Sequence, residues 1–181
     1  FVEVASVNTG TKWIKVAAGF QHSMGLRDDG KLYAWGDCSY GQLGIGVAGA
    51  DISFNTPQPV SLITNSAGIV TGKKWTQIAC GYYHSIGLRD DGTLWAWGLN
   101  ANGQLGHGNN FSVNYPENVL GGGYSYISCS AGAYHSMGVR NDGNVYTWGL
   151  NANGQLGINS ITNHNAPQLI TDISLNPIIN I

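Results

Sequence analysis

Three histidines, His22, His84 and His135, are the residues whose type and recurrence are best suited to chemistry. Three imidazole nitrogens can bind a catalytic zinc ion. The three side chains occupy the same position in three copies of one stretch, however, and repeats of this kind mostly duplicate packing residues. We therefore expect each ring to form a hydrogen bond to backbone or serine within its own repeat, as buried polar groups do. The sequence thus predicts neither a metal site nor a cofactor site.

Two pairs of neighbouring carboxylates, Asp28-Asp29 and Asp90-Asp91, could serve a glycoside hydrolase, which acts through two acids. Both pairs lie in sequences typical of tight turns, and the third copy has Asn141-Asp142 in their place. No companion base accompanies them. We expect them to form turns, and we predict no catalytic residue. The arginine before each turn is expected to pair with these acids at the surface, namely Arg27, Arg89 and Arg140.

The glycine-rich sequence GQLG, which also occurs three times, is a candidate phosphate-binding loop. Such loops bind phosphate when a helix follows them, because the helix N-terminus supplies N–H donors. No helical pattern follows any of the three copies. The sequence therefore argues against dinucleotide and P-loop sites.

All of these residues belong to one stretch that occurs at His22–Gly44, His84–Gly106 and His135–Gly157 and aligns without a gap. The histidines are separated by 62 and then 51 residues, and the difference lies between GQLG and the following copy. Self-similarity at this period indicates a repeat architecture.

The sequence of each copy predicts four short strands. A first strand ends in small residues, a second begins at the repeated histidine, and an Asp-Gly turn leads to a third that ends in Trp-Gly. A last extended piece contains proline, which suits an edge strand because the missing N–H is tolerated there. The first strands are expected at 13–19, 75–81 and 126–132, and the outer ones at 57–60, 116–119 and 167–170.

Four antiparallel strands per repeat are typical of a β-propeller blade, so we predict an all-β fold built of such blades. The predicted units are 2–60, 61–119 and 120–170, followed by the start of a further blade at 171–181. About three blades cannot close a propeller. We therefore expect a segment of a larger propeller, completed by further blades or by self-association.

Composition narrows the possible partners. Charged residues make up 10% of the chain, the net charge is −2, and no Lys/Arg run exceeds Lys73-Lys74, so no nucleic acid is expected as a partner. No apolar run is long enough to span a membrane.

Cys38 is expected in a polar loop and Cys80 and Cys129 as small buried residues, with no disulfide framework. The low lysine content and many asparagines slightly favour an extracellular or bacterial-surface location.

The pattern G-x-x-H-S-x-x-L/V-x-x-D-G-x-x-x-x-W-G-x-x-x-x-G-Q-L-G resembles the repeat of the regulator of chromosome condensation family and covers the chain three times. The resemblance implies a propeller, usually of seven blades, in which the repeated residues hold the blades together. Trp35, Trp97 and Trp148 are accordingly expected to pack blade against blade.

The functional prediction is a non-catalytic protein-interaction scaffold that presents variable loops on a rigid propeller. Phe54, Phe111 and Tyr115 are the candidate contact residues, because aromatic side chains dominate interface energies. The partner is expected to be a protein. Two alternatives follow from the resemblance, namely guanine-nucleotide exchange on a small GTPase and binding of the kind that secreted enzyme inhibitors perform.

Overall fold

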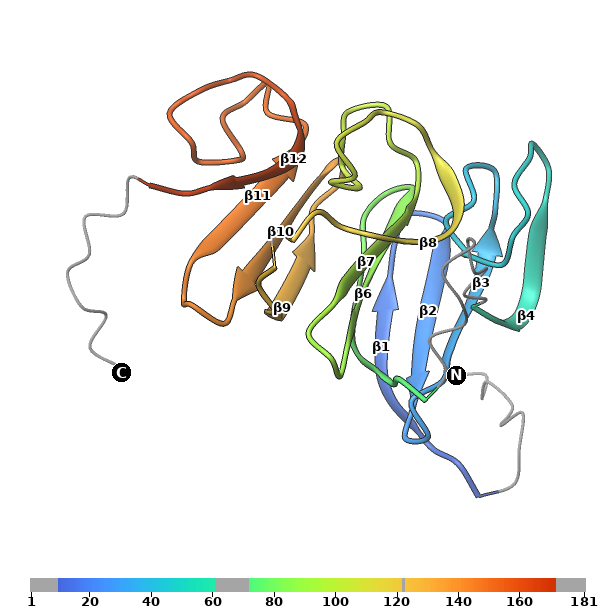
Figure 1. Ribbon diagram of the computed structural model, residues 1–181. Coiled ribbons are helices and arrows are strands. Elements are labelled where there is room, and N and C mark those ends of the chain that lie inside the picture. Colours follow the sequence, from blue (N-terminus) through green and yellow to red (C-terminus); the bar gives the residue numbers. More distant parts are fainter. Residues whose placement is uncertain (1–9, 61–71, 122, 172–181) are drawn as a thin grey trace.

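The computed structural model describes residues 10–60, 72–121 and 123–171. Within these ranges the chain forms twelve strands and no helix, arranged as three antiparallel sheets of four strands (Figure 1). The all-β architecture of four-stranded blades is therefore confirmed. No segment in the described ranges forms a helix long and apolar enough to cross a membrane.

The strands follow one another across each sheet in chain order. Blade one consists of β1 (Trp13–Ala18), β2 (His22–Arg27), β3 (Leu32–Asp37) and β4 (Ser53–Pro59). Blade two consists of β5 (Trp75–Cys80), β6 (His84–Arg89), β7 (Leu94–Gly98) and β8 (Val113–Asn118). Blade three consists of β9 (Tyr126–Ala131), β10 (His135–Arg140), β11 (Val145–Gly149) and β12 (His164–Leu169).

The repeated Asp-Gly turn sets the register of each central hairpin. In blade one, β2 and β3 pair Met24 with Ala34 and Leu26 with Leu32, and the turn between them uses Gly30 at φ 81°. This backbone conformation is open to glycine at little cost. The outer strands are edge strands as predicted, but each begins three or four residues earlier than the proline pattern indicated.

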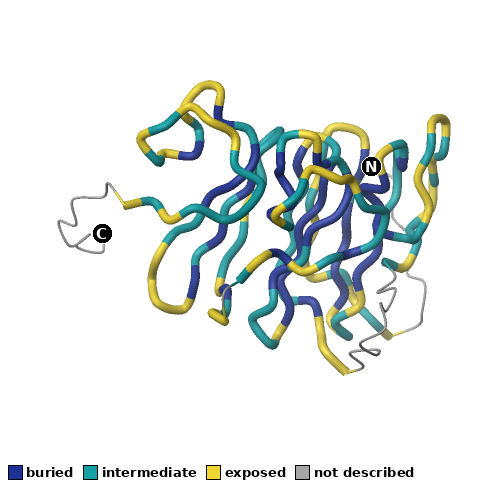
Figure 2. Tube along the Cα trace, turned by 45° about the horizontal axis from the view of Figure 1, so that its top comes forward, coloured by how far each residue is buried: buried dark blue, intermediate teal, exposed yellow. Residues whose placement is uncertain are grey.

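The blades stand side by side and share their cores. Among the first strands, β5 contacts both β1 and β9, so these strands form the inner side of the array, and β4, β8 and β12 form the outer side. Figure 2 shows that buried residues concentrate in the central strands. The GQLG loops at 41–44 and 103–106 are buried as well.

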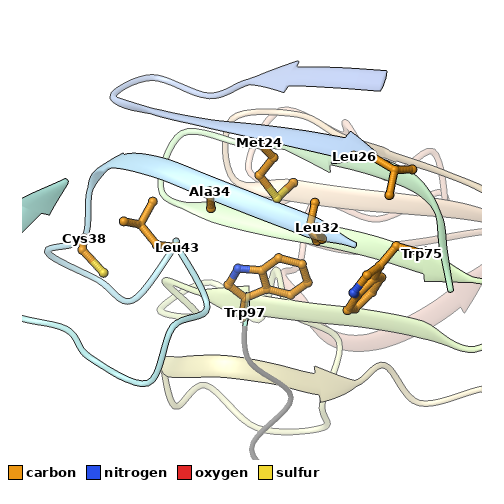
Figure 3. Packing of buried hydrophobic residues seen from close by; sticks show 8 residues of the cluster. All are labelled: Met24, Leu26, Leu32, Ala34, Cys38, Leu43, Trp75 and Trp97. Atoms are coloured by element: carbon orange, nitrogen blue, oxygen red, sulfur yellow. The ribbon is translucent and has the colours of Figure 1, made fainter. Parts of the chain in front are cut away.

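Apolar burial occurs between blades rather than within one. Trp75 and Trp97 of blade two pack against a cluster from blade one (Figure 3). Tyr126 and Trp148 of blade three complete the second cluster in the same way. A single sheet cannot cover its own apolar face, so each blade depends on the next for its core. The blade-one members of the first cluster are Met24, Leu26, Leu32, Ala34, Cys38 and Leu43.

One cysteine is more buried than its loop position suggested. Cys38 lies in the loop after β3, as predicted, but its side chain is fully buried in this first cluster, and its thiol donates to the carbonyl of Val47 at 3.2 Å. Cys80 and Cys129 are half-buried, and burial raises the pKa of each thiol to about 12. All three are free thiols.

Candidate functional site

The repeated histidines lie at the contacts between blades. His22 Nε2 lies 2.9 Å from Ser85 Oγ, and His84 Nε2 lies 2.9 Å from Ser136 Oγ. In both cases the serine belongs to the following blade. The expectation that each ring bonds within its own repeat was therefore wrong, because the central strands of adjacent blades approach closely enough for their side chains to meet.

A buried His–Ser pair has the composition of a nucleophile and its base. The hydroxyl proton of each serine already forms a hydrogen bond to another group, however. Ser85 Oγ donates to the backbone carbonyl of Gln42 at 2.8 Å, and Ser136 Oγ donates to that of Gln104 at 2.7 Å. A hydroxyl has one proton, so in each pair the imidazole Nε2–H must donate to the serine oxygen. The ring holds a proton where a base would need a lone pair.

Burial also removes these histidines from acid–base work near neutral pH. It lowers the pKa of His22 to about 4 and that of His84 to about 3. His84, Ser85 and Ser136 have no exposed surface, so no substrate can reach them. A general base needs a pKa near the working pH and contact with the proton that it removes. The arrangement supports bonding between blades rather than hydrolysis.

The repeated tryptophans converge on the same carbonyls. Trp97 Nε1 donates to Gln42 O and Trp148 Nε1 donates to Gln104 O, each at 2.9 Å. One carbonyl thus receives two donors from the next blade, a serine hydroxyl and an indole N–H. We call each set of histidine, serine, glutamine and tryptophan a blade joint. Two are present among the described residues, one between blades one and two and one between blades two and three.

The histidines do not assemble into a metal site. Two of them bond to separate serines, and His135 is half-buried in blade three. Among the residues that the structure describes, no group of three or more His, Cys, Asp or Glu side chains could hold a metal ion.

The repeated arginines are buried, which corrects the prediction of surface ion pairs. Arg27, Arg89 and Arg140 are 2%, 2% and 6% exposed. The Arg140 guanidinium lies 3.6 Å from the centroid of the Tyr146 ring. Arg27 does reach Asp29 at 3.5 Å, but it also donates to the Tyr33 hydroxyl at 3.2 Å. The guanidinium carbon of each arginine lies within 5.6 Å of the centroid of an aromatic ring, and such contacts strengthen when water is excluded.

The turn acids accept hydrogen bonds from backbone within their own turns. The Oδ1 atoms of Asp29, Asp91 and Asp142 each accept from the N–H two residues later, at 3.1, 3.1 and 2.9 Å. This is the local bonding for which aspartate is favoured in turns. These bonds give the second aspartate of each turn a structural role that needs no substrate.

The three candidate contact residues occupy different environments. Phe111 is 78% exposed in the loop before β8. Tyr115 is half-buried in β8, where a hydrogen bond with Glu117 raises the pKa of its hydroxyl, and it lines a hollow of about 350 Å³ between blades one and two. Phe54 is half-buried in β4 and packs against the first core cluster. Phe111 is thus the candidate best placed to meet a partner.

One further group was not singled out by the sequence. Five aromatic rings meet at one end of the blades, and we call them the aromatic face. Four lie in the connections between first and second strands, and Tyr40 lies in the connection between β3 and β4. Each occupies a position at which the three copies differ, and that variability within an otherwise regular repeat was the available signal. The residues are Phe20, Tyr40, Tyr82, Tyr83 and Tyr134.

Comparison with protein families identifies the repeat. Two models of the regulator of chromosome condensation (RCC1) repeat match the chain. One matches residues 13–42, 75–104 and 126–155, and the other matches 29–88, 91–139 and 142–181.

Curated relatives are similar over most of this chain. The ultraviolet-B receptor UVR8 of Arabidopsis thaliana is 34% identical over 168 residues, which is 92% of this chain and 36% of the receptor. The human E3 ubiquitin-protein ligase HERC2 is 33% identical over 171 residues, which is 93% of this chain and 3% of the ligase. The chain therefore spans about a third or less of the length of these relatives.

Solved structures share the fold. Prp20p from Saccharomyces cerevisiae, described together with its binding properties to Gsp1p and histones, superimposes with a TM-score of 0.76 at 24% identity. The superposition covers 88% of this chain and 38% of Prp20p. Human WBSCR16 superimposes with a TM-score of 0.72 at 25% identity, covering 90% of this chain and 40% of the human protein. A crystal structure of the yeast protein bound to Kap60 matches similarly, with a TM-score of 0.75.

Proposed function

Because this chain belongs to the regulator of chromosome condensation (RCC1) repeat family, we propose that it is a non-catalytic protein-interaction scaffold. In this proposal the blades form a rigid support, and the loops that differ between copies meet a partner protein. One observation carries it: the repeated groups that could do chemistry are buried and bonded between blades, whereas the variable loop before β8 exposes 78% of Phe111.

The proposal assigns structural roles to the repeated polar and aromatic residues. Buried hydrogen bonds of this type contribute about 1 kcal/mol each and are costly to leave half-made. Buried indole rings contribute more through the apolar surface that they remove from water. The residues proposed as structural are His22, His84, His135, Trp35, Trp97 and Trp148.

The terminal blades support the proposal that further blades, or a second copy, complete the propeller. Trp35 and His135 are only half-buried, whereas Trp97 and His84 at the equivalent positions are fully buried. The difference follows from position, since Trp35 has no preceding blade and His135 no following blade among the described residues. A neighbouring blade at either end would supply the missing contacts.

The scaffold proposal predicts that Phe111 contributes to partner binding. Proteins captured by the wild-type chain should be retained at least about tenfold more weakly by Phe111→Ala, since a central aromatic contact is worth about 2 kcal/mol or more. Quantitative mass spectrometry after affinity capture measures the ratio. Ile161→Ala is the matched control, because Ile161 is 72% exposed in the corresponding loop of blade three.

The competing activity is nucleotide exchange. We expect the chain to leave the release of a fluorescent guanine nucleotide unchanged across a panel of small GTPases. Acceleration of release from any member would replace the scaffold proposal with the exchange-factor alternative. Equal capture by wild type, Phe111→Ala and Ile161→Ala would show that the β8 loop is not the contact surface.

A further inference from the structure

The aromatic face is continuous across all three blades. Phe20 of blade one stacks on Tyr82 of blade two, with ring centroids 5.1 Å apart and planes inclined by 28°. Tyr82 meets Tyr134 of blade three at 5.3 Å, and Tyr83 meets Tyr40 at 5.1 Å. The rings therefore support one another, so little side-chain freedom is lost when a ligand binds to them.

These rings are accessible although they are packed together. Phe20 is 57% exposed, Tyr82 44% and Tyr40 43%. Phe20 and Tyr82 also wall a hollow of about 390 Å³ whose other lining residues are glycine, alanine and Cys80. Packing within one chain explains the contacts between the rings, but it does not explain why so much aromatic surface stays in water.

The repeat itself does not require aromatic residues here. The position of Phe20 and Tyr82 is held by Ala133 in blade three, and Asn102 stands at the position of Tyr40 in blade two. The blades form whether or not these positions hold aromatic residues. The aromatic face is thus an addition to the scaffold rather than part of its core.

Charge is distributed unevenly between the two ends of the strands. Every Lys and Arg of the chain lies at the end opposite the aromatic face, except Lys15 within β1. The register places them there, since Trp13 at the start of β1 pairs with Arg27 at the end of β2. The cations at the far end are Lys12, Arg27, Lys31, Lys73, Lys74, Arg89 and Arg140.

The aromatic end carries two acidic groups and no Lys or Arg, whereas the cations at the far end stand beside the turn aspartates. Asp37 closes β3 next to the rings, and Asp51 follows in the same connection. Partial burial, the hydroxyls of Tyr134 and Tyr40, and the Asp37 carboxylate together raise the pKa of Tyr83. Aromatic faces and a carboxylate both attract positive charge, and no Lys or Arg competes for them.

We propose that the aromatic face binds a partner protein through an arginine or lysine side chain, which lies across the exposed rings of Phe20 and Tyr82 with its charge toward Asp37. The proposal rests on the scaffold function and names the chemistry of one partner segment. It concerns residues other than Phe111, although Tyr40 of the aromatic face and Ser112 of the Phe111 loop line one shared hollow.

Three labelled peptides of one length test this inference. One contains arginines spaced by glycine and serine, the second has citrulline, which keeps the shape and removes the charge, and the third has glutamate. Fluorescence anisotropy at low salt should give affinity for the arginine peptide about tenfold or more above that for citrulline. The glutamate peptide should not bind.

Variants locate the binding surface. Phe20→Ala and Tyr82→Ala should each weaken binding of the arginine peptide by about three- to tenfold, as expected for loss of one exposed cation–π contact and its apolar area. Tyr83→Phe keeps the ring and should bind nearly as well as wild type. Ile161→Ala, exposed but outside the aromatic face, should leave binding unchanged. Equal melting temperatures establish that the variants are folded.

Two results would overturn the inference: equal affinity for the arginine and citrulline peptides, or equal binding by Tyr82→Ala and Ile161→Ala. Failure here leaves the scaffold proposal standing if capture still depends on Phe111. Loss of the Phe111 effect with peptide binding intact would instead overturn the assignment of the β8 loop.

Discussion

Replacing Trp97 with alanine is expected to lower the free energy of unfolding by about 3–5 kcal/mol, the usual cost of removing a buried indole from a packed core. Trp97 has no exposed surface and belongs to blade two, yet it packs in the cluster formed by blade one. The substitution therefore removes apolar contact across the boundary between the blades. It also removes the N–H that donates to Gln42 O at 2.9 Å.

Trp35 provides a control at the same position of the repeat. It is half-buried, and no preceding blade covers it among the described residues. Trp35→Ala should therefore cost clearly less than Trp97→Ala, and Trp148→Ala should resemble Trp97→Ala because Trp148 is equally buried. Denaturant unfolding of the three variants measures the comparison. Equal losses at Trp35 and Trp97 would contradict packing between blades as the source of stability.

Acidification from pH 7 to pH 5 is expected to destabilise the fold by about 4 kcal/mol. The folded-state pKa is about 4 for His22 and about 3 for His84, below the ordinary value of 6.5, because burial disfavours the charged ring. Below pH 6.5 the unfolded chain binds protons that the folded chain does not, so stability falls as pH falls. Each histidine contributes a slope of up to about 1.4 kcal/mol per pH unit until its folded pKa is reached.

A single substitution separates this effect from other titrations. His84→Gln keeps a side-chain N–H that can donate to Ser136 but does not titrate, so it should remove the part of the slope that His84 contributes, which is at most about half between pH 7 and pH 5. Burial also lowers the pKa values of His107 and His135, which act in the same direction. Chemical denaturation at each pH gives the slope. A stability that does not change over this range, in wild type, would refute neutral buried histidines.

The sequence was informative about the elements that repeat. Asp-Gly turns, alternating apolar residues and the recurring Trp-Gly predicted the strands of each blade, because these are local properties of the chain. The partner of His22 could not be predicted in the same way. Ser85 lies 63 residues away, and the bond depends on how two sheets pack rather than on either sheet alone.

The burial of the arginines could not be predicted from the sequence for the same reason. Arg27 and Arg89 stand next to acidic turns, so local reasoning favoured exposed ion pairs. The aromatic residues that cover them come from neighbouring strands, for example Tyr33 beside Arg27 and Trp95 beside Arg89. The aromatic face was missed because its members are scattered between residues 20 and 134 and come together only when three blades are stacked.

The bond between His84 and Ser136 joins blades two and three most directly. A double-mutant cycle of His84→Ala and Ser136→Ala, read by denaturant unfolding, isolates the free energy of their interaction. We predict a coupling of about 1 kcal/mol or more for this pair, as for a buried hydrogen bond. Ser85 and His135, which are not bonded to each other, should give a coupling near zero in a parallel cycle. Additive losses for His84 and Ser136 would contradict the claim that the repeated residues hold consecutive blades together.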